Sequence, residues 1–222
     1  KLGFVSKEDG IECEQGFFLT HGWDKKIPPR AIENLGTDFL FPEIKYKFHA
    51  CCHGLHSFLE ALDEMKLENN FNPETIEEIA IETNPSWLKV CNIEEPKTGL
   101  ESKFSYKLTA AMSIYGKDTS DLDTYSDEIC FDDNLNNIRD KVRVIPNDNL
   151  SNTQSLISIK DGSSNVKNKH DLSDKIENNI LETKIVNKSV SLLSETKSNQ
   201  ISKILNAPNE NKVDALVDCL VS

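Results

Sequence analysis

Histidine and cysteine side chains crowd the start of the stretch KFHACCHGLHSFLEAL, residues 47–62. Its imidazoles and thiols are those of His49, Cys51, Cys52, His53 and His56. Such groups can bind a metal ion, and an imidazole can also accept or donate a proton near neutral pH. A third possibility is that polar side chains here simply cap the free amides at the start of a helix.

A metal site in this stretch would use His49, His53 and His56 together with Cys52. His53 and His56 would lie one turn apart on a helix, whereas His49 would reach them only if the helix began before Ala50. No carboxylate or further Cys/His cluster follows as an obvious fourth ligand. We therefore expect neither a metal ion nor another cofactor, and the metal site is kept as an alternative hypothesis.

A helix and two strands are expected to position these side chains. After the histidines, apolar residues recur at the spacing of an amphipathic helix, and this pattern ends at the segment ENNFNP. These residues are Leu55, Phe58, Leu59, Leu62 and Met65. Upstream, FLFPEIKYKF is β-prone, with Pro42 at a strand start or sheet edge. Downstream, NPETIEEIAIET alternates apolar and polar residues like a half-buried strand.

Further elements are predicted along the rest of the chain. After a long loop, Leu100, Phe104, Leu108, Ala111 and Tyr115 indicate a second helix that ends at Gly116. A helix across DDNLNNIRDK precedes the segments VRVIPND and SLISIKDG, which are typical of paired strands. Asp161-Gly162 indicates a turn into a further strand near NVKNK.

Helical sequence lies at both ends of this mixed region. IECEQGFFLTHGW predicts a short helix near the start, and the chain is helical in character from Asp171 onward. Asp171 or Ser173 is a suitable cap, and Pro208 separates the last two helices. The fold class expected from the residues is therefore α+β, with a central domain flanked by helices.

Composition excludes several classes of protein. The 222 residues carry 25 basic and 37 acidic side chains, and this net charge of −12 argues against a nucleic-acid partner. Apolar runs reach only four or five residues, so no membrane partner is expected. The six cysteines show no repeated CxxC spacing, which favours reduced thiols and a cytoplasmic protein.

Five short segments resemble, in order, those of the MmgE/PrpD family. The stretch beginning at Lys47 is similar to the family's K-x-Y-P-C-C-R-x-T-H segment and the apolar helix after it. The other four are IECEQGFF, GLESKFSYKLTAAMSIYGK, the pair DKVRVIPND and ISIKDG, and ILETKIVNKSVSLL. The family includes 2-methylcitrate dehydratases, cis-aconitate decarboxylases and iminodisuccinate epimerases.

The resemblance implies a domain organisation. In the family a large all-helical domain is closed by a smaller α+β lid, and the active site lies between them. The lid would run over residues 44–170, and residues 1–43 and 171–222 would belong to the helical domain. The resemblance covers only the C-terminal half of a member, so we expect a homodimer or pairing with an N-terminal helical half.

The resemblance also implies roles for individual residues. Lys47 falls on the family's site lysine, which would hold a substrate carboxylate, and His56 falls on a histidine suited to proton transfer. His53, where many members have arginine, and Lys103 would contribute to substrate binding. Leu108 stands where relatives commonly carry a tyrosine, and Tyr106 lies too far around the helix to replace it.

The expected activity is metal-independent elimination from a small di- or tricarboxylate, as in a 2-methylcitrate dehydratase. Two alternatives stay open: an epimerase that returns the proton to the opposite face, and a chain that is inactive by itself, either a non-catalytic remnant or half of a split enzyme.

Overall fold

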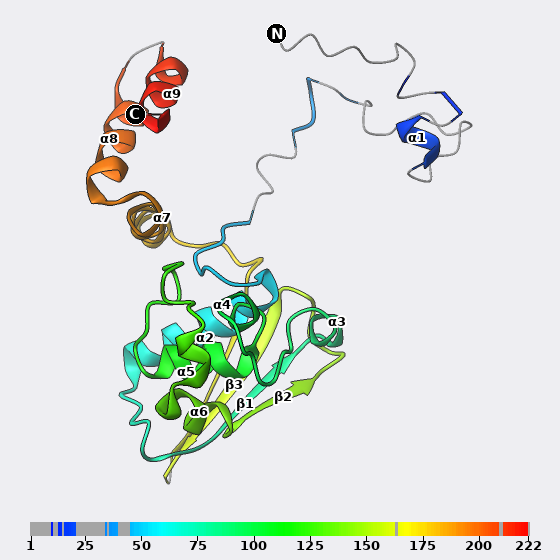
Figure 1. Ribbon diagram of the computed structural model, residues 1–222, viewed down its shortest axis with the longest axis vertical. Helices are drawn as coiled ribbons and strands as arrows, with labels where there is room; N and C mark the ends of the chain where they lie inside the picture. Colours follow the sequence, from blue (N-terminus) through cyan, green and yellow to red (C-terminus); the bar gives the residue numbers. More distant parts are fainter. Residues whose placement is uncertain are drawn as a thin grey trace. The chain divides into compact units, whose positions relative to one another are not determined.

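A computed structural model describes residues 10, 13–14, 16–20, 34, 36–39, 45–162, 164–208 and 211–221 (Figure 1). The chain divides into two compact units, residues 1–45 and 46–222. The first unit contains helix α1 (Phe17–Thr20), which falls within the short helix predicted there. The second unit holds the residues predicted to do chemistry.

The sheet of the second unit has four strands in the order β2-β1-β3-β4. The strands are β1 (Ile76–Thr83), β2 (Val142–Pro146), β3 (Gln154–Asp161) and β4 (Ser164–Asp171). β2 runs parallel to β1, whereas β1–β3 and β3–β4 are antiparallel. A mixed sheet combined with helices confirms the α+β class.

The predicted pairing of VRVIPND with SLISIKDG is wrong, because β1 lies between β2 and β3. The apolar side chains of β1 alternate into the core, and Ile79 and Ile81 are fully buried. On the opposite face Glu78 is paired with Arg143, and Glu82 accepts a hydrogen bond from Asn147. A strand with one face in the core and the other held by neighbouring polar groups suits the sheet interior better than its edge.

Two other strand predictions have different outcomes. The turn at Asp161-Gly162 is confirmed: Gly162 has a φ of 58°, which suits glycine, and it joins β3 to β4. The β-prone segment over residues 39–48 forms no strand at 39 or 45–48, and residues 40–44 lie outside the described part.

Helix α2 (His56–Glu68) confirms the predicted amphipathic helix and packs on β3 and β4. Its residues Phe58, Leu59 and Leu62 are fully buried. The short helix η3 (His53–Leu55) precedes it directly. In Figure 1, α2, α5 (Tyr106–Ile114) and α6 (Asp133–Arg139) lie over one face of the sheet. The helix expected across DDNLNNIRDK is therefore confirmed.

The single helix predicted between Leu100 and Tyr115 is split into α4 (Gly99–Ser102) and α5. Ser105 caps α5, because its hydroxyl accepts from the amide of Leu108. The carbonyls of Lys103 and Phe104 accept hydrogen bonds from other segments. The long loop before α4 contains α3 (Pro85–Leu88), and η4 (Glu128–Phe131) precedes α6.

The C-terminal region forms α7 (Asn178–Leu193), α8 (Glu195–Asn206) and α9 (Lys212–Val221), with Pro208 between the last two as predicted. The predicted cap at Asp171 or Ser173 is wrong, because α7 begins only after Glu177. The Asp171 carboxylate instead accepts from the amide and hydroxyl of Ser173 and closes a turn after β4. Among the described helices, none is long and apolar enough to cross a membrane.

Gly54, within η3, lies against two side chains that leave no room for a larger residue. A Cβ atom at this position would lie 2.5 Å from the Trp87 ring and 2.8 Å from Sγ of Cys91. The Trp87 indole cannot easily move, because its Nε1 donates to the carbonyl of Asn152 at 2.8 Å. We expect Gly54→Ala to lower the free energy of unfolding by about 1–3 kcal/mol in urea denaturation.

Trp87→Leu provides the control for this clash. In the Gly54→Ala background the smaller side chain should recover part of the lost stability, so that the two substitutions are not additive. Strictly additive losses would show that the Gly54–Trp87 contact is not the cause.

Candidate functional site

Three imidazoles gather where the chain enters α2. The ring of His56 lies 5.1 Å from that of His49 and 5.3 Å from that of His53, measured between ring centroids. His49 and His56 are buried, and His53 is half-buried with its ring beside Trp87. The structure therefore brings together the histidines that the sequence pattern singled out.

His56 is held in the neutral state. Burial, followed by the charges on His49, His53 and Lys47, lowers its pKa from 6.5 to about 3. Its ring makes a hydrogen bond to the backbone of Cys51, which favours protonation but does not outweigh these effects.

The Nε2 atom of His56 is buried, without a hydrogen-bond partner in the described part of the chain. Since the bond to a backbone carbonyl requires an N–H donor, we assign the proton to Nδ1. Nε2 then carries a free lone pair that can accept a proton.

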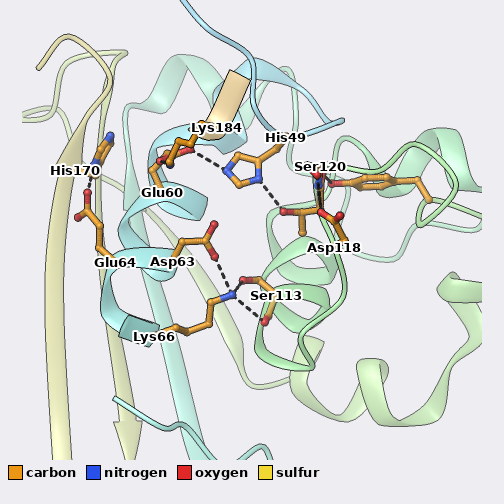
Figure 2. Close-up of polar contacts among 12 residues, drawn as sticks. His49, Glu60, Asp63, Glu64, Lys66, Ser113, Asp118, Ser120, His170 and Lys184 are labelled. Atoms are coloured by element: carbon orange, nitrogen blue, oxygen red, sulfur yellow. Dashed lines mark hydrogen bonds and ion pairs between the residues drawn. The ribbon is translucent and has the colours of Figure 1, made fainter. Parts of the chain in front are cut away.

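His49 bridges two elements of the fold (Figure 2). Its Nδ1 lies 2.7 Å from the hydroxyl of Thr119, and its Nε2 lies 3.2 Å from Oε1 of Glu60 on α2. The ammonium of Lys184, on α7, contacts the other oxygen of the same carboxylate and also lies 5.1 Å from the Phe48 ring centroid. One buried carboxylate thus joins the segment before α2, helix α2 itself and helix α7.

The Glu60 carboxylate is ionised in this setting. Burial alone would raise its pKa, but the contacts with His49 and Lys184 outweigh it and lower the pKa from 4.5 to about 2. A buried negative charge therefore persists at neutral pH, with a cation beside it.

A cleft of about 180 Å³ opens beside this network. Its walls come from the segment before α2, from α2, from the loop 118–120 and from α7. Its acidic, basic and imidazole lining residues are His49, Glu60, Asp63, Asp118, Lys184 and Lys188.

Lys47 and Lys103 are placed differently. Lys47 is exposed next to the buried imidazoles, where its charge affects His56 and the thiol of Cys51, but it does not line the cleft. Lys103 is half-buried, with its ammonium 5.5 Å from the Tyr125 ring centroid. Its backbone carbonyl accepts from the amide of Cys52, which links the α4–α5 junction to the histidine segment.

Tyr106 does not line the cleft. Its hydroxyl donates to the carbonyl of Gly54 at 2.7 Å and lies 3.1 Å from the hydroxyl of Thr83, and the side chain is fully buried. Leu108 is buried as well. That Tyr106 cannot replace the phenol that relatives carry at the position of Leu108 stays a prediction.

The metal alternative finds no support in the geometry. In the described ranges, no three His, Cys, Asp or Glu side chains are arranged to hold a metal ion. Both ring nitrogens of His49 already face Thr119 and Glu60. Cys51, Cys52 and Cys91 are free thiols, and burial raises the pKa of Cys51 to about 12.

Sequence reasoning did not identify Glu60, Thr119, Lys184 or Lys188 as parts of the site. One signal was present: Glu60 lies among Phe58, Leu59 and Leu62, and a charge inside a buried stripe requires a partner. Its partner Lys184 is 124 residues away in the chain, and no local pattern predicts that contact.

The second unit is thus an α+β domain whose first core helix begins with clustered imidazoles, next to an exposed lysine. Residues 49–207 match the MmgE/PrpD C-terminal domain, and the chain belongs to the MmgE/PrpD family. The match extends through α7 and α8. Comparison with curated proteins gave no match.

Proposed function

We propose that this chain forms one wall of a site at which a small di- or tricarboxylate loses a proton and then a leaving group. The observation that carries the proposal is the buried lone pair on Nε2 of His56, next to the exposed ammonium of Lys47. A proton acceptor beside a cation suits removal of a proton next to a carboxylate. Family membership supports this chemistry.

In the proposed reaction the Lys47 ammonium holds one carboxylate and stabilises negative charge that develops when the neighbouring C–H bond breaks. His56 accepts that proton on Nε2. With its pKa lowered to about 3, the imidazole is a weak base in the unliganded site. A bound polyanion would raise this pKa, so that proton transfer becomes favourable only when substrate is present.

His53 and Lys103 are the proposed additional substrate-binding groups. His53 lies against the ring of His56 and could bind a carboxylate when protonated. Lys103 would act from the α4–α5 junction beside Cys52. No metal ion or cofactor is required by this scheme, since the charges are supplied by side chains.

Elimination of water, as in a 2-methylcitrate dehydratase, is the reaction that we favour. An epimerase acting on a compound such as iminodisuccinate would use the same first step and return the proton to the opposite face. Reaction in heavy water separates the two, because deuterium incorporation without loss of water indicates epimerisation.

The chain is proposed to act with a partner. Residues 44–170 would form the lid, and residues 1–43 and 171–222 would belong to a helical domain completed by a family-type N-terminal half or by a second copy. A folded but inactive remnant is the remaining alternative. Co-expression with a family-type N-terminal half, followed by assays with 2-methylcitrate, cis-aconitate and iminodisuccinate, tests the proposal.

Lys47→Ala is the decisive variant in that assay. We expect turnover to fall by roughly a hundredfold or more, because one charge-stabilising donor commonly contributes that much. The free energy of unfolding should change by less than about 0.5 kcal/mol, since the side chain is exposed.

Lys45→Ala is the matched control, because Lys45 is also exposed and lies two residues away. It should leave turnover unchanged. Full activity in Lys47→Ala would contradict the role assigned to Lys47.

A further inference from the structure

A hydroxyl, an imidazole and a carboxylate follow one another along the wall of the cleft. Oγ1 of Thr119 lies 2.7 Å from Nδ1 of His49, and Nε2 of the same ring lies 3.2 Å from Oε1 of Glu60. All three residues line the cleft, and Figure 2 shows the contacts of His49 and Glu60. A hydroxyl at one ring nitrogen and a carboxylate at the other is the order of groups in the triads of nucleophilic catalysis.

The charge of Glu60 gives this chain of contacts a direction. The carboxylate is ionised at neutral pH and can only accept, so we assign the ring proton of neutral His49 to Nε2. Nδ1 then accepts from the hydroxyl of Thr119 and is the basic atom of the ring. The Lys184 ammonium contacts the other oxygen of Glu60, which leaves Oε1 for the imidazole.

Thr119 is held in place through its backbone. Its carbonyl accepts from the amide of Ala50 at 2.8 Å and from the hydroxyl of Tyr125 at 3.0 Å. The hydroxyls of Thr109 and Thr183 donate to carbonyls of their own helices, whereas that of Thr119 faces a basic nitrogen on a distant segment. A positioned hydroxyl next to a general base is the group that can act as a nucleophile.

A cation lies next to these three groups. Lys188, on α7, is half-buried and lines the same cleft. Its ammonium donates to the carbonyl of Ser120, the residue after Thr119, at 2.6 Å. Negative charge develops on a carbonyl oxygen when a hydroxyl adds to the carbonyl carbon, and a positioned ammonium stabilises that charge. Lys188 is therefore suited to stabilise an oxyanion formed at Thr119.

We propose that Thr119 is the nucleophile of a second catalytic site, which hydrolyses esters of short acyl chains. The Thr119 oxygen bonds to the acyl carbon while its proton passes to Nδ1 of His49. The ester C–O bond then breaks, and the leaving alkoxide takes that proton. Water attacks the acyl group with the same nitrogen as base, which releases a carboxylic acid and returns the proton to Thr119. Glu60 is a positioning residue that orients the ring and stabilises its charged form.

The cleft limits the size of the substrate. At about 180 Å³ it is smaller than the pockets that enclose drug-sized ligands, so a short acyl group suits it better than a long chain. The site goes beyond the elimination proposed above and does not depend on it, because it uses neither Lys47 nor Nε2 of His56.

The experiment follows acylation of the full chain by p-nitrophenyl acetate. Release of p-nitrophenolate gives the rate, and peptide mapping by mass spectrometry after an acid quench locates the acetyl group. We expect an initial burst of p-nitrophenolate and an acetyl ester on Thr119. Thr119→Val should abolish both, whereas Thr119→Ser, which keeps a hydroxyl, should retain both. Thr183→Val is the matched control at an exposed position of α7 and should behave as wild type.

Glu60→Gln separates a triad from a merely structural contact. We expect the maximal rate of acylation to fall at least about a hundredfold, with the ester concentration at half-saturation unchanged. Acetyl groups on lysines alone, an unchanged burst in Thr119→Val or an unchanged rate in Glu60→Gln would each overturn the proposal. If Thr119→Val does not fold, the absence of an acetyl ester at residue 119 in both wild type and Thr119→Ser overturns it.

Discussion

Between pH 6.5 and pH 5 the free energy of unfolding is expected to fall by about 2 kcal/mol because of His56 alone. Its pKa is about 3 in the folded protein against 6.5 ordinarily, so in this window the unfolded chain binds a proton that the folded protein does not. The contribution is complete at a pH well above 6.5, and below pH 6.5 it decreases by up to about 1.4 kcal/mol for each unit of acidification. Urea denaturation at half-unit pH intervals measures this slope.

The variant His56→Asn provides the comparison, because its amide can still donate to the backbone of Cys51 but cannot be protonated. It should be less stable than wild type at pH 8 and show a shallower slope between pH 6.5 and pH 5. Glu60 affects stability at lower pH: its pKa is lowered from 4.5 to about 2, so its contribution is lost as the pH falls through that range. An unchanged slope in His56→Asn would show that His56 is not the neutral, buried group described above.

Lys184→Met is expected to lower the free energy of unfolding at pH 7 by about 1–3 kcal/mol. The substitution leaves the Glu60 carboxylate, 7% exposed, without its ammonium partner, and breaking a buried ion pair is usually costly. The loss is moderate because the Lys184 side chain itself is 30% exposed, so that solvent partly screens its charge. Hydrogen exchange of the α7 amides should become faster, since this contact ties α7 to α2.

A double-mutant cycle separates this ion pair from general effects of the substitution. The double variant Glu60→Gln/Lys184→Met should lose less free energy of unfolding than the two single variants lose together. In the double variant both charges of the pair are gone, so no buried charge is left without its partner. Lys203→Met, at an exposed position of α8, is the control and should change neither stability nor exchange. Simple additivity would mean that Glu60 and Lys184 do not interact in solution.

Local patterns predicted the elements whose stability depends on neighbouring residues in the chain. The apolar period of α2, the alternation of β1 and the Asp161-Gly162 turn are all confirmed. The patterns failed where distant partners decide the outcome. The break before α5 depends on the carbonyls of Lys103 and Phe104, which accept hydrogen bonds from other segments. The position of β2 in the sheet depends on its pairing with β1, which comes much earlier in the chain.

The candidate site follows the same division. His53, His56 and Lys47 could be proposed because they lie in one motif, and the structure places the two histidines in contact. Glu60, Thr119 and Lys188 meet at the cleft only after the chain has folded. Charge pairing across such separations leaves no periodic signal in a sequence, which is why α7 was recognised as a helix but not as part of the site.

The central position of β1 also determines how this unit can be assembled during synthesis. The strand leaves the ribosome before residues 84–141, yet both of its hydrogen-bonding neighbours lie beyond them. Until then its two backbone edges are unpaired, and pairings of such long range make folding slow. The apolar side chains of β1 therefore lack their final partners until residues 142–161 have been synthesised, and the three glutamates of the strand, Glu77, Glu78 and Glu82, disfavour its aggregation in that interval.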